Sequence, residues 1–262
     1  MTFTALALDT CDGVATVTLC RPTLLNRFDA VLHDEFADAL EQIGKLPSVR
    51  AVLLRSEGKV FSAGGDFDLM RRAHADVSFR QSTIDQARNV LTALSTLRQP
   101  IVAAVQGPAV GLGATVTLAC DVVVAARSAS LADAHVGMAL AAGDGGALFW
   151  PQSAGMLRAR RYLLTGDSIT ASEAYQFGLV TDLVESADDV RAESERLARH
   201  LADLPAWAVQ STKRILNQST MFRANEVVET GLLLEADTMA SSDLLTAIDA
   251  FESTRGPRVT GR

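Results

Sequence analysis

Two glycine-rich segments combine residue types that suit the binding of an oxygen atom by backbone groups. The first reads FSAGGD over residues 61–66, and the second reads QGPAVGLGAT over residues 106–115. Glycine lets a backbone approach a ligand closely, and the first turn of a helix leaves N–H groups unpaired at the positive end of its dipole. Two such turns together can direct two N–H donors at one oxygen. Taken singly, each is more simply explained as a tight connection between a strand and a helix.

The segments around these turns have the patterns of strands and amphipathic helices. Apolar-rich runs predict a hairpin near the N-terminus, with its turn at residues 11–13, followed by strands buried on both faces. Asp29 can cap a helix that ends at Gly44, and the next helix ends before Pro100. The expected strands are residues 3–8, 14–19, 51–54, 101–105, 122–126 and 179–184. Strands that alternate with helices predict an α/β fold with a mostly parallel sheet.

The pattern after about residue 147 is mostly helical. Val190, Leu197 and Leu201 share one helix face, and a last helix is expected over residues 243–251. No low-complexity linker separates this part from the rest of the chain. We therefore predict an α/β core over residues 1–195 and a helical C-terminal region over residues 196–262, packed on the core or on a neighbouring subunit.

Composition excludes several classes of function. The chain has 262 residues, 48% of them apolar, and a net charge of −7, so no basic field attracts it to nucleic acid or to an anionic membrane. Its three cysteines fit neither a metal site nor a disulfide framework, and no signal peptide is expected. The expected compartment is the cytoplasm. The 22 residues without formal charge between Arg98 and Asp121 contain Pro100 and Gly107, so they predict a strand, a turn and a buried helix rather than a membrane span.

Six short motifs follow one another along the chain. They are Arg21-Pro22-x-x-Leu25-Asn26, residues 61–66, residues 107–113, Cys120-Asp121, Gly143-Asp144-Gly145-Gly146 and Leu164-Thr165-Gly166. In this order they resemble the crotonase, or enoyl-CoA hydratase/isomerase, family, and the likeness extends to Ala250-Phe251. The resemblance implies a core of repeated ββα units, an acyl-CoA thioester as substrate, no further cofactor and no metal. It also implies a homotrimer or a dimer of trimers.

The resemblance assigns binding roles to individual residues. In this family two backbone N–H groups hold the thioester carbonyl in an oxyanion hole, and the matching positions are Gly65 and Leu112. Removing a proton beside a thioester builds negative charge on its oxygen, which such donors stabilise. The positions expected to contact CoA are Thr23, Leu24, Ala63, Asp66, Phe67 and Gly111. The C-terminal segment around Phe251 and Arg255 is expected to help hold CoA across a subunit boundary.

The acid and base positions depart from the family pattern. Family hydratases carry glutamates at the positions of Thr115 and His135, and two carboxylates can together orient, deprotonate and deliver a water. A threonine hydroxyl can hold a water but is not a base near neutral pH. His135 has a side chain that can accept or donate a proton at working pH, although a buried histidine with one hydrogen bond is the commoner case. Asp144 is a second candidate proton carrier, and it can equally cap the helix that follows.

These features lead to a predicted enzyme that processes acyl-CoA, nominally an enoyl-CoA hydratase or isomerase. Isomerisation needs only one working base, so it suits Thr115, His135 and Asp144 at least as well as hydration does. The alternative is a catalytically degenerate acyl-CoA-binding protein, because both hydratase glutamates are replaced. The other histidines, His33, His74 and His200, are predicted to lie at the surface.

Overall fold

The first two strands form the predicted hairpin. In the computed structural model, which describes residues 3–254, β1 (Leu6–Cys11) pairs antiparallel with β2 (Val14–Leu19). Asp12 and Gly13 connect them with φ angles of 50° and 81°, the left-handed conformation that tight hairpin turns use. The first strand lies three residues later than the predicted range of 3–8, and the turn is one residue shorter than predicted because Cys11 belongs to the strand.

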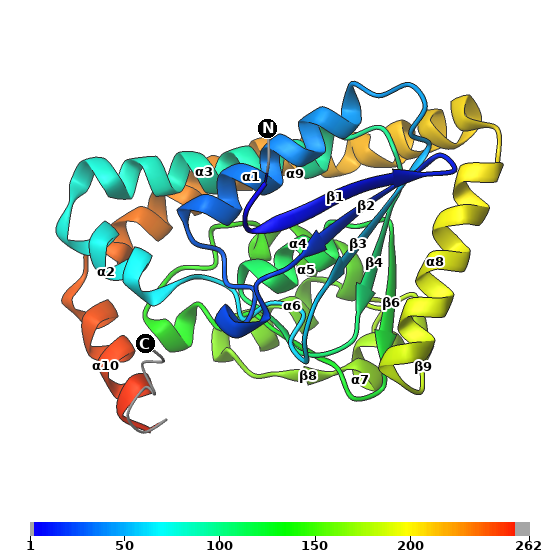
Figure 1. Cartoon of the computed structure of the whole chain (residues 1–262). Helices are drawn as coiled ribbons and strands as arrows, with labels where there is room; N and C mark the ends of the chain where they lie inside the picture. The colour runs from blue at the N-terminus through cyan, green and yellow to red at the C-terminus, as the bar shows by residue number, and fades with distance from the viewer. Residues whose placement is uncertain (1–2, 255–262) are drawn as a thin grey trace.

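A six-stranded sheet forms the centre of the fold (Figure 1). Its strand order is β1-β2-β3-β4-β6-β9, and every pair after the hairpin is parallel. The other strands of this sheet are β3 (Ala51–Ser56), β4 (Ile101–Val105), β6 (Val122–Ala126) and β9 (Asp182–Val184). The predicted α/β class is confirmed. β9 is shorter than predicted, since Leu179 and Val180 are buried but precede the strand.

Helices cover both faces of the sheet, which explains the uninterrupted apolar runs of its central strands. α8 packs on one face through Val190 and Ala198, and the larger core on the other face includes parts of α1, α3, α4 and α5. In chain order the helices are α1 (Ala30–Gly44), α2 (Phe67–Ala75), α3 (Val77–Thr96), α4 (Leu112–Leu118), α5 (Gly146–Ala154), α6 (Met156–Thr165), α7 (Ala171–Gln176), α8 (Ala187–Asp203), α9 (Ala206–Met239) and α10 (Ser242–Thr254). Asp29 caps α1 as predicted, because its carboxylate accepts the N–H of Leu32 at 2.9 Å.

A small second sheet and α2 are absent from the prediction. β5 (Ala109–Val110), β7 (Ser130–Ala132) and β8 (Ile169–Thr170) form this sheet in the order β5-β7-β8. Strands of two or three residues are too short for an alternating pattern to stand out in the sequence. α2 begins directly after the first glycine turn, where Asp66 accepts the N–H groups of Asp68 and Leu69.

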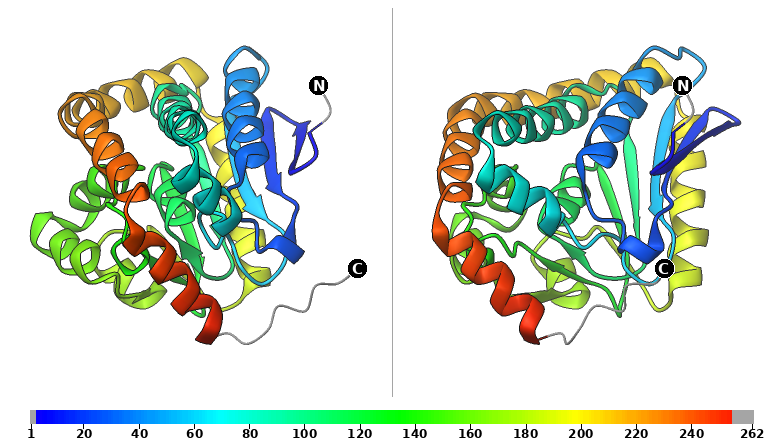
Figure 2. Two further views of the ribbon diagram at one scale, coloured as in Figure 1. Left: turned by 90° about the vertical axis from the view of Figure 1, so that its left-hand side faces the viewer. Right: turned by 60° about the vertical axis from the view of Figure 1, so that its left-hand side comes forward.

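The last two helices lie outside the layer of helices directly on the six-stranded sheet, although the start of α9 reaches the end of the sheet (Figure 2). α9 packs along α3 and α5, and α10 lies beside α2. Near the start of α9 the buried Lys213 pairs with Asp121 at 2.6 Å and donates to the carbonyl of Gln99 at 2.9 Å. Residue 195 lies within α8, so the helical region that follows it consists of the end of α8 with α9 and α10.

The uncharged stretch between Arg98 and Asp121 forms β4, β5 and the buried helix α4. The second glycine turn connects these elements, as the sequence predicted. No helix within residues 3–254 has both the length and the apolar character of a membrane span.

Asn26 joins the segment after β2 to the first glycine turn. Its side chain is fully buried, and its amide donates to the carbonyls of Glu57, Val60 and Phe61 at 2.9–3.2 Å. Asn26→Ala leaves these carbonyls without that donor, so we expect it to lower the free energy of unfolding by about 2–4 kcal/mol. Urea denaturation measures this loss.

Asn89→Ala is the matched control, because Asn89 is exposed on α3. It should change stability by no more than about 0.5 kcal/mol. An equally small effect of Asn26→Ala would show that these hydrogen bonds do not stabilise the turn.

Candidate active site

A cavity of about 700 Å³ is bordered by both glycine turns. The first turn contributes Ala63, Gly64 and Gly65, and the second contributes Val110 and Gly111. Residues of α2, α10 and the short 3₁₀ turns η1 (Pro22–Leu24) and η2 (Val136–Met138) complete the wall. The two turns that the sequence singled out therefore meet at one cavity.

The two turns are in direct backbone contact. A Cβ atom on Gly64 would lie 2.6 Å from the carbonyl oxygen of Val110, and Gly64 has a φ of 81°, so glycine is required there. The N–H of Val110 donates to the carbonyl of Ser62 at 2.9 Å, and Ser62 also forms a parallel bridge with Ala109. This short ladder fixes one turn against the other.

Several backbone N–H groups in these turns make no hydrogen bond to any residue in the range 3–254. Two of them belong to Gly65, which borders the cavity, and to Leu112, which follows the cavity residue Gly111. Leu112 is the first residue of α4, and N–H groups at the start of a helix have no acceptor in a preceding turn. Both N–H groups are therefore available to an acceptor.

The cavity wall contains most of the positions predicted to contact CoA. They are Thr23, Leu24, Ala63, Phe67 and Gly111. Asp66 is not among the lining residues, because its carboxylate caps α2 and pairs with Arg27 at 3.1 Å. Arg27 does border the cavity, as does Phe251 of α10, whose ring packs edge to face on Phe67 at 5.3 Å. Arg255 lies outside the described residues.

His135 borders the cavity and is held by carboxylates at both ring nitrogens. Nδ1 lies 2.6 Å from Oδ1 of Asp133, and Nε2 lies 3.2 Å from Oδ2 of Asp144. All three side chains are buried, with residue exposures of 7% or less. Asp133 directly follows β7, and η2 begins directly after His135, so two regular elements fix the spacing of this pair.

These carboxylates keep His135 protonated. Burial by itself lowers the pKa of the imidazole, but the charges of Asp144 and Asp133 and the hydrogen bonds to both raise that pKa well above its ordinary value. Oδ2 of Asp133 lies against Gly146 in the first turn of α5, where the helix dipole favours a negative charge. His135 is therefore a proton donor near neutral pH. The sequence alone predicted only that its side chain could accept or donate a proton.

Thr115 and Asp144 lie behind His135 and are not lining residues of the cavity. The buried Thr115 hydroxyl donates to Oδ1 of Asp144 over 3.4 Å. Asp144 does not cap α5, because the N-cap position is Gly145 and no side chain makes a capping hydrogen bond there. The structure thus brings the three predicted acid–base residues together, with only His135 on the cavity wall.

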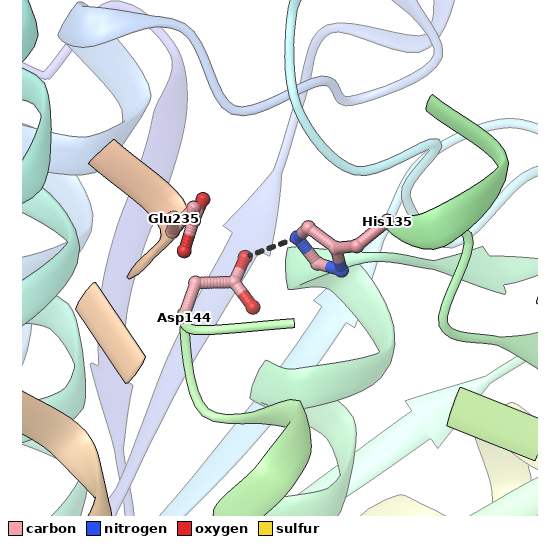
Figure 3. A group of neighbouring side chains, drawn as sticks. All are labelled: His135, Asp144 and Glu235. Carbon is pink, nitrogen blue, oxygen red and sulfur yellow. Dashed lines mark ion pairs between the residues drawn. The ribbon is translucent and has the colours of Figure 1, made fainter. Parts of the chain in front are cut away.

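Glu235 is a member of this cluster that the sequence analysis missed. It projects from α9 toward His135 and Asp144 (Figure 3), and one ligand atom of each residue lies within 4.8 Å of the others. Burial and the charge of Asp144 raise the pKa of Glu235 to about 8, so it is protonated at neutral pH. A Cβ on Gly143 would lie 2.2 Å from the carbonyl oxygen of Gly231, so two glycines let α9 pack directly on the loop that carries Asp144.

His135, Asp144 and Glu235 are also of the types that ligate divalent cations. However, Nε2 of His135 already lies at hydrogen-bonding distance from Asp144, and its Nδ1 is bonded to Asp133. An imidazolium pairs with one oxygen of each carboxylate without an ion, while Oδ2 of Asp133 has no hydrogen-bond partner within residues 3–254. We therefore interpret the cluster as a buried group of acid and base side chains in which His135 and Asp144 form the ion pair.

His33 corrects the sequence analysis, which placed it at the surface. It is 5% exposed, its Nδ1 lies 2.8 Å from the carbonyl oxygen of Asp29, and burial lowers its pKa. It occupies the same face of α1 as Phe36 and Leu40, so the helical periodicity already contained this signal. His200 is exposed as predicted, whereas His74 is partly buried.

Comparisons with known proteins agree with this architecture. A model of the enoyl-CoA hydratase/isomerase family matches residues 9–262. The chain belongs to this family. It is 32% identical over 257 residues to the 1,2-epoxyphenylacetyl-CoA isomerase of Escherichia coli K12, covering 95% of this chain and 96% of that protein. It is 27% identical over 265 residues to the trans-2-decenoyl-[acyl-carrier-protein] isomerase of Streptococcus mutans, covering 100% of both.

A solved enoyl-CoA hydratase/isomerase from Mycobacterium paratuberculosis has the same fold. The TM-score is 0.90 at 34% identity, with 94% of this chain and 98% of that chain covered. The crotonase-type fold with a helical C-terminal region, predicted from the motif order, is thus confirmed for this member of the enoyl-CoA hydratase/isomerase family.

Asp133→Asn tests the charge balance around His135. An asparagine oxygen can still accept from Nδ1, but the negative charge is gone, so we expect the pKa of His135 to fall by about 1–3. An NMR titration of the histidine ring protons measures the change, with the His135 signal assigned from its absence in His135→Ala.

The control is Asp167→Asn, which removes a carboxylate that pairs with Arg161 at the surface. It should leave the pKa of His135 unchanged. If Asp133→Asn also leaves it unchanged, Asp133 does not sustain the imidazolium.

Proposed function

We propose that this protein acts on acyl-CoA thioesters and isomerises an enoyl-CoA by moving a proton and a double bond. The observation that carries the proposal is the His135–Asp144 pair beside the glycine turns, since it combines an acidic N–H with a basic carboxylate. The family supports the thioester substrate. The relative named as a trans-2-decenoyl-[acyl-carrier-protein] isomerase supports isomerisation of an enoyl thioester, and the relative named as a 1,2-epoxyphenylacetyl-CoA isomerase supports isomerisation of a CoA thioester in general.

In the proposed mechanism, the N–H groups of Gly65 and Leu112 receive the thioester oxygen. Their lack of another partner and the contact between their turns support this role. Negative charge grows on that oxygen when a proton leaves the neighbouring carbon. Two fixed donors stabilise the charge, and one such donor is worth about 10²–10³ in rate. A leucine is compatible with the second position because only its backbone takes part.

The His135–Asp144 pair moves the proton. The Asp144 carboxylate takes up the Nε2 proton of His135, which frees Nε2 on the cavity wall to accept the proton that leaves one carbon, while the electron pair delocalises toward the thioester oxygen. The proton then returns to a different carbon of the same chain, so the pair ends in its starting state. The Thr115 hydroxyl fixes Asp144 by donating to Oδ1, whereas His135 faces Oδ2. This cycle requires no glutamate at position 115.

The CoA moiety is proposed to lie along Thr23, Leu24, Ala63, Phe67 and Gly111. The net charge of −7 repels a polyanionic ligand, so local cations such as Arg27 on the cavity wall must provide the attraction. A homotrimer or dimer of trimers in the cytoplasm remains our expectation. It is supported by large apolar side chains that are exposed on α6 and α9, including Leu157, Leu164, Trp207, Ile215, Leu216 and Phe222.

A catalytically degenerate acyl-CoA binder is the second candidate, favoured by the replacement of both hydratase glutamates with Thr115 and His135. One experiment separates it from the enzyme. The purified protein is incubated with 2-enoyl-CoA and 3-enoyl-CoA thioesters of short, medium and long chains, and the products are identified by mass spectrometry after chromatography. We expect positional isomers of the double bond. Hydrated products would instead assign a hydratase, and tight binding without turnover would assign the binder.

His135→Ala should lower kcat/KM for the converted substrate by about a hundredfold or more, because it removes both an acidic group and the partner of Asp144. Stopped assays with the purified variant measure this loss. His200→Ala, at an exposed site on α8, should retain full activity. A loss of about threefold or less for His135→Ala would exclude it from proton transfer.

A further inference from the structure

Glu235 comes from α9, a helix that carries no other residue of the cluster around His135 and Asp144. It lies on α9, is 5% exposed, and its Oε2 has no hydrogen-bond partner within residues 3–254. The contact of Gly231 with Gly143 holds α9 against the loop that carries Asp144. A second tie is the hydroxyl of Thr238, which accepts the N–H of Ala141 at 3.0 Å. The position of Glu235 beside Asp144 is therefore built into the packing.

The groups that face Glu235 make a third negative charge unfavourable. Asp144 and Asp133 are already paired with the two N–H groups of a single imidazolium on His135. His33 on α1 is neutral, and His74 on α2 is bonded to the carbonyl of Met239. Within residues 3–254 no lysine or arginine forms an ion pair with Glu235. A buried carboxyl group without a cation takes up a proton instead of ionising.

We propose that Glu235 is a positioning residue that works as a neutral carboxylic acid, and that its neutrality keeps the His135–Asp144 pair able to exchange a proton with the substrate. This inference rests on the proposed function for the pair. Glu235 is not a lining residue of the cavity, so it acts through Asp144 and not on the substrate. An ionised Glu235 would compete with Asp144 for the imidazolium of His135. Its negative charge would hold the imidazolium proton more tightly.

The sign of the pH dependence follows from the protonation of Glu235. Its pKa of about 8 means that the acid is neutral below that pH and charged above it. Activity is therefore lost on the alkaline side. For a single ionisation near pH 8, kcat/KM falls about tenfold by pH 9.

Glu235→Gln tests the inference, because glutamine has the same shape and stays neutral at every pH. We expect its kcat/KM at neutral pH to remain within about threefold of wild type and its alkaline decline to disappear. Asp237→Asn changes the same charge at an exposed position two residues further along α9 and should keep the wild-type pH profile. An unchanged decline in Glu235→Gln overturns the proposal. A loss of about a hundredfold or more at neutral pH also overturns it, because the proton of Glu235 would then itself be transferred.

Infrared spectroscopy tests the protonation of Glu235 without any substrate. The difference spectrum between about pH 6 and pH 10 should show the loss of a protonated carboxyl carbonyl band in the wild type and in Asp237→Asn, but not in Glu235→Gln. If no thioester is converted, the proposed function fails, while this measurement still decides the state of Glu235. Absence of the band in the wild type overturns the inference.

Discussion

The site depends on how three buried carboxyl groups share one imidazole. Asp133, Asp144 and Glu235 are each 5% exposed or less, and a buried carboxylate without a partner is strongly destabilising. The imidazolium of His135 pairs with two of them, and the start of α5 adds a favourable dipole beside Asp133. The third carboxyl keeps its proton. The number of protons in the cluster is therefore set by the fold before any substrate binds.

The architecture must bring three separate segments to this point: the link from β7 to η2, the loop before α5, and α9. The end of β7 provides Asp133, η2 follows His135, the loop before α5 provides Asp144, and α9 provides Glu235. The parallel sheet and the small second sheet fix the glycine turns, while α9 closes the cluster from the other side. Because the His135 ring contacts Asp133 of its own segment and Asp144 of a separate loop, it is held more tightly than a single loop could hold it. That rigidity keeps each ring nitrogen of His135 within hydrogen-bonding distance of a carboxylate.

Sequence patterns predicted what local signals encode. The cap at Asp29 and the apolar runs of β3, β4 and β6 place those elements to within about two residues, as is usual for element boundaries. The second sheet was missed because its strands are too short to show periodicity. Glu235 was missed because its burial depends on the contact of Gly231 with Gly143, far away in the sequence. A glycine inside a long helix disfavours the helix, and it was the one local sign of this close approach.

The two departures from the family pattern are physically linked. A carboxylate at position 115 would lie where the Thr115 hydroxyl now donates to Asp144, and it would add a like charge to a cluster in which Asp133 and Asp144 already share the His135 imidazolium. Once His135 pairs with Asp144, a hydrogen-bond donor at position 115 is the compatible choice. A site that only binds has no need of this cluster, since replacing buried ion pairs by apolar residues is often neutral or stabilising. The retained charges thus favour a rearranged proton-transfer site over a degenerate one.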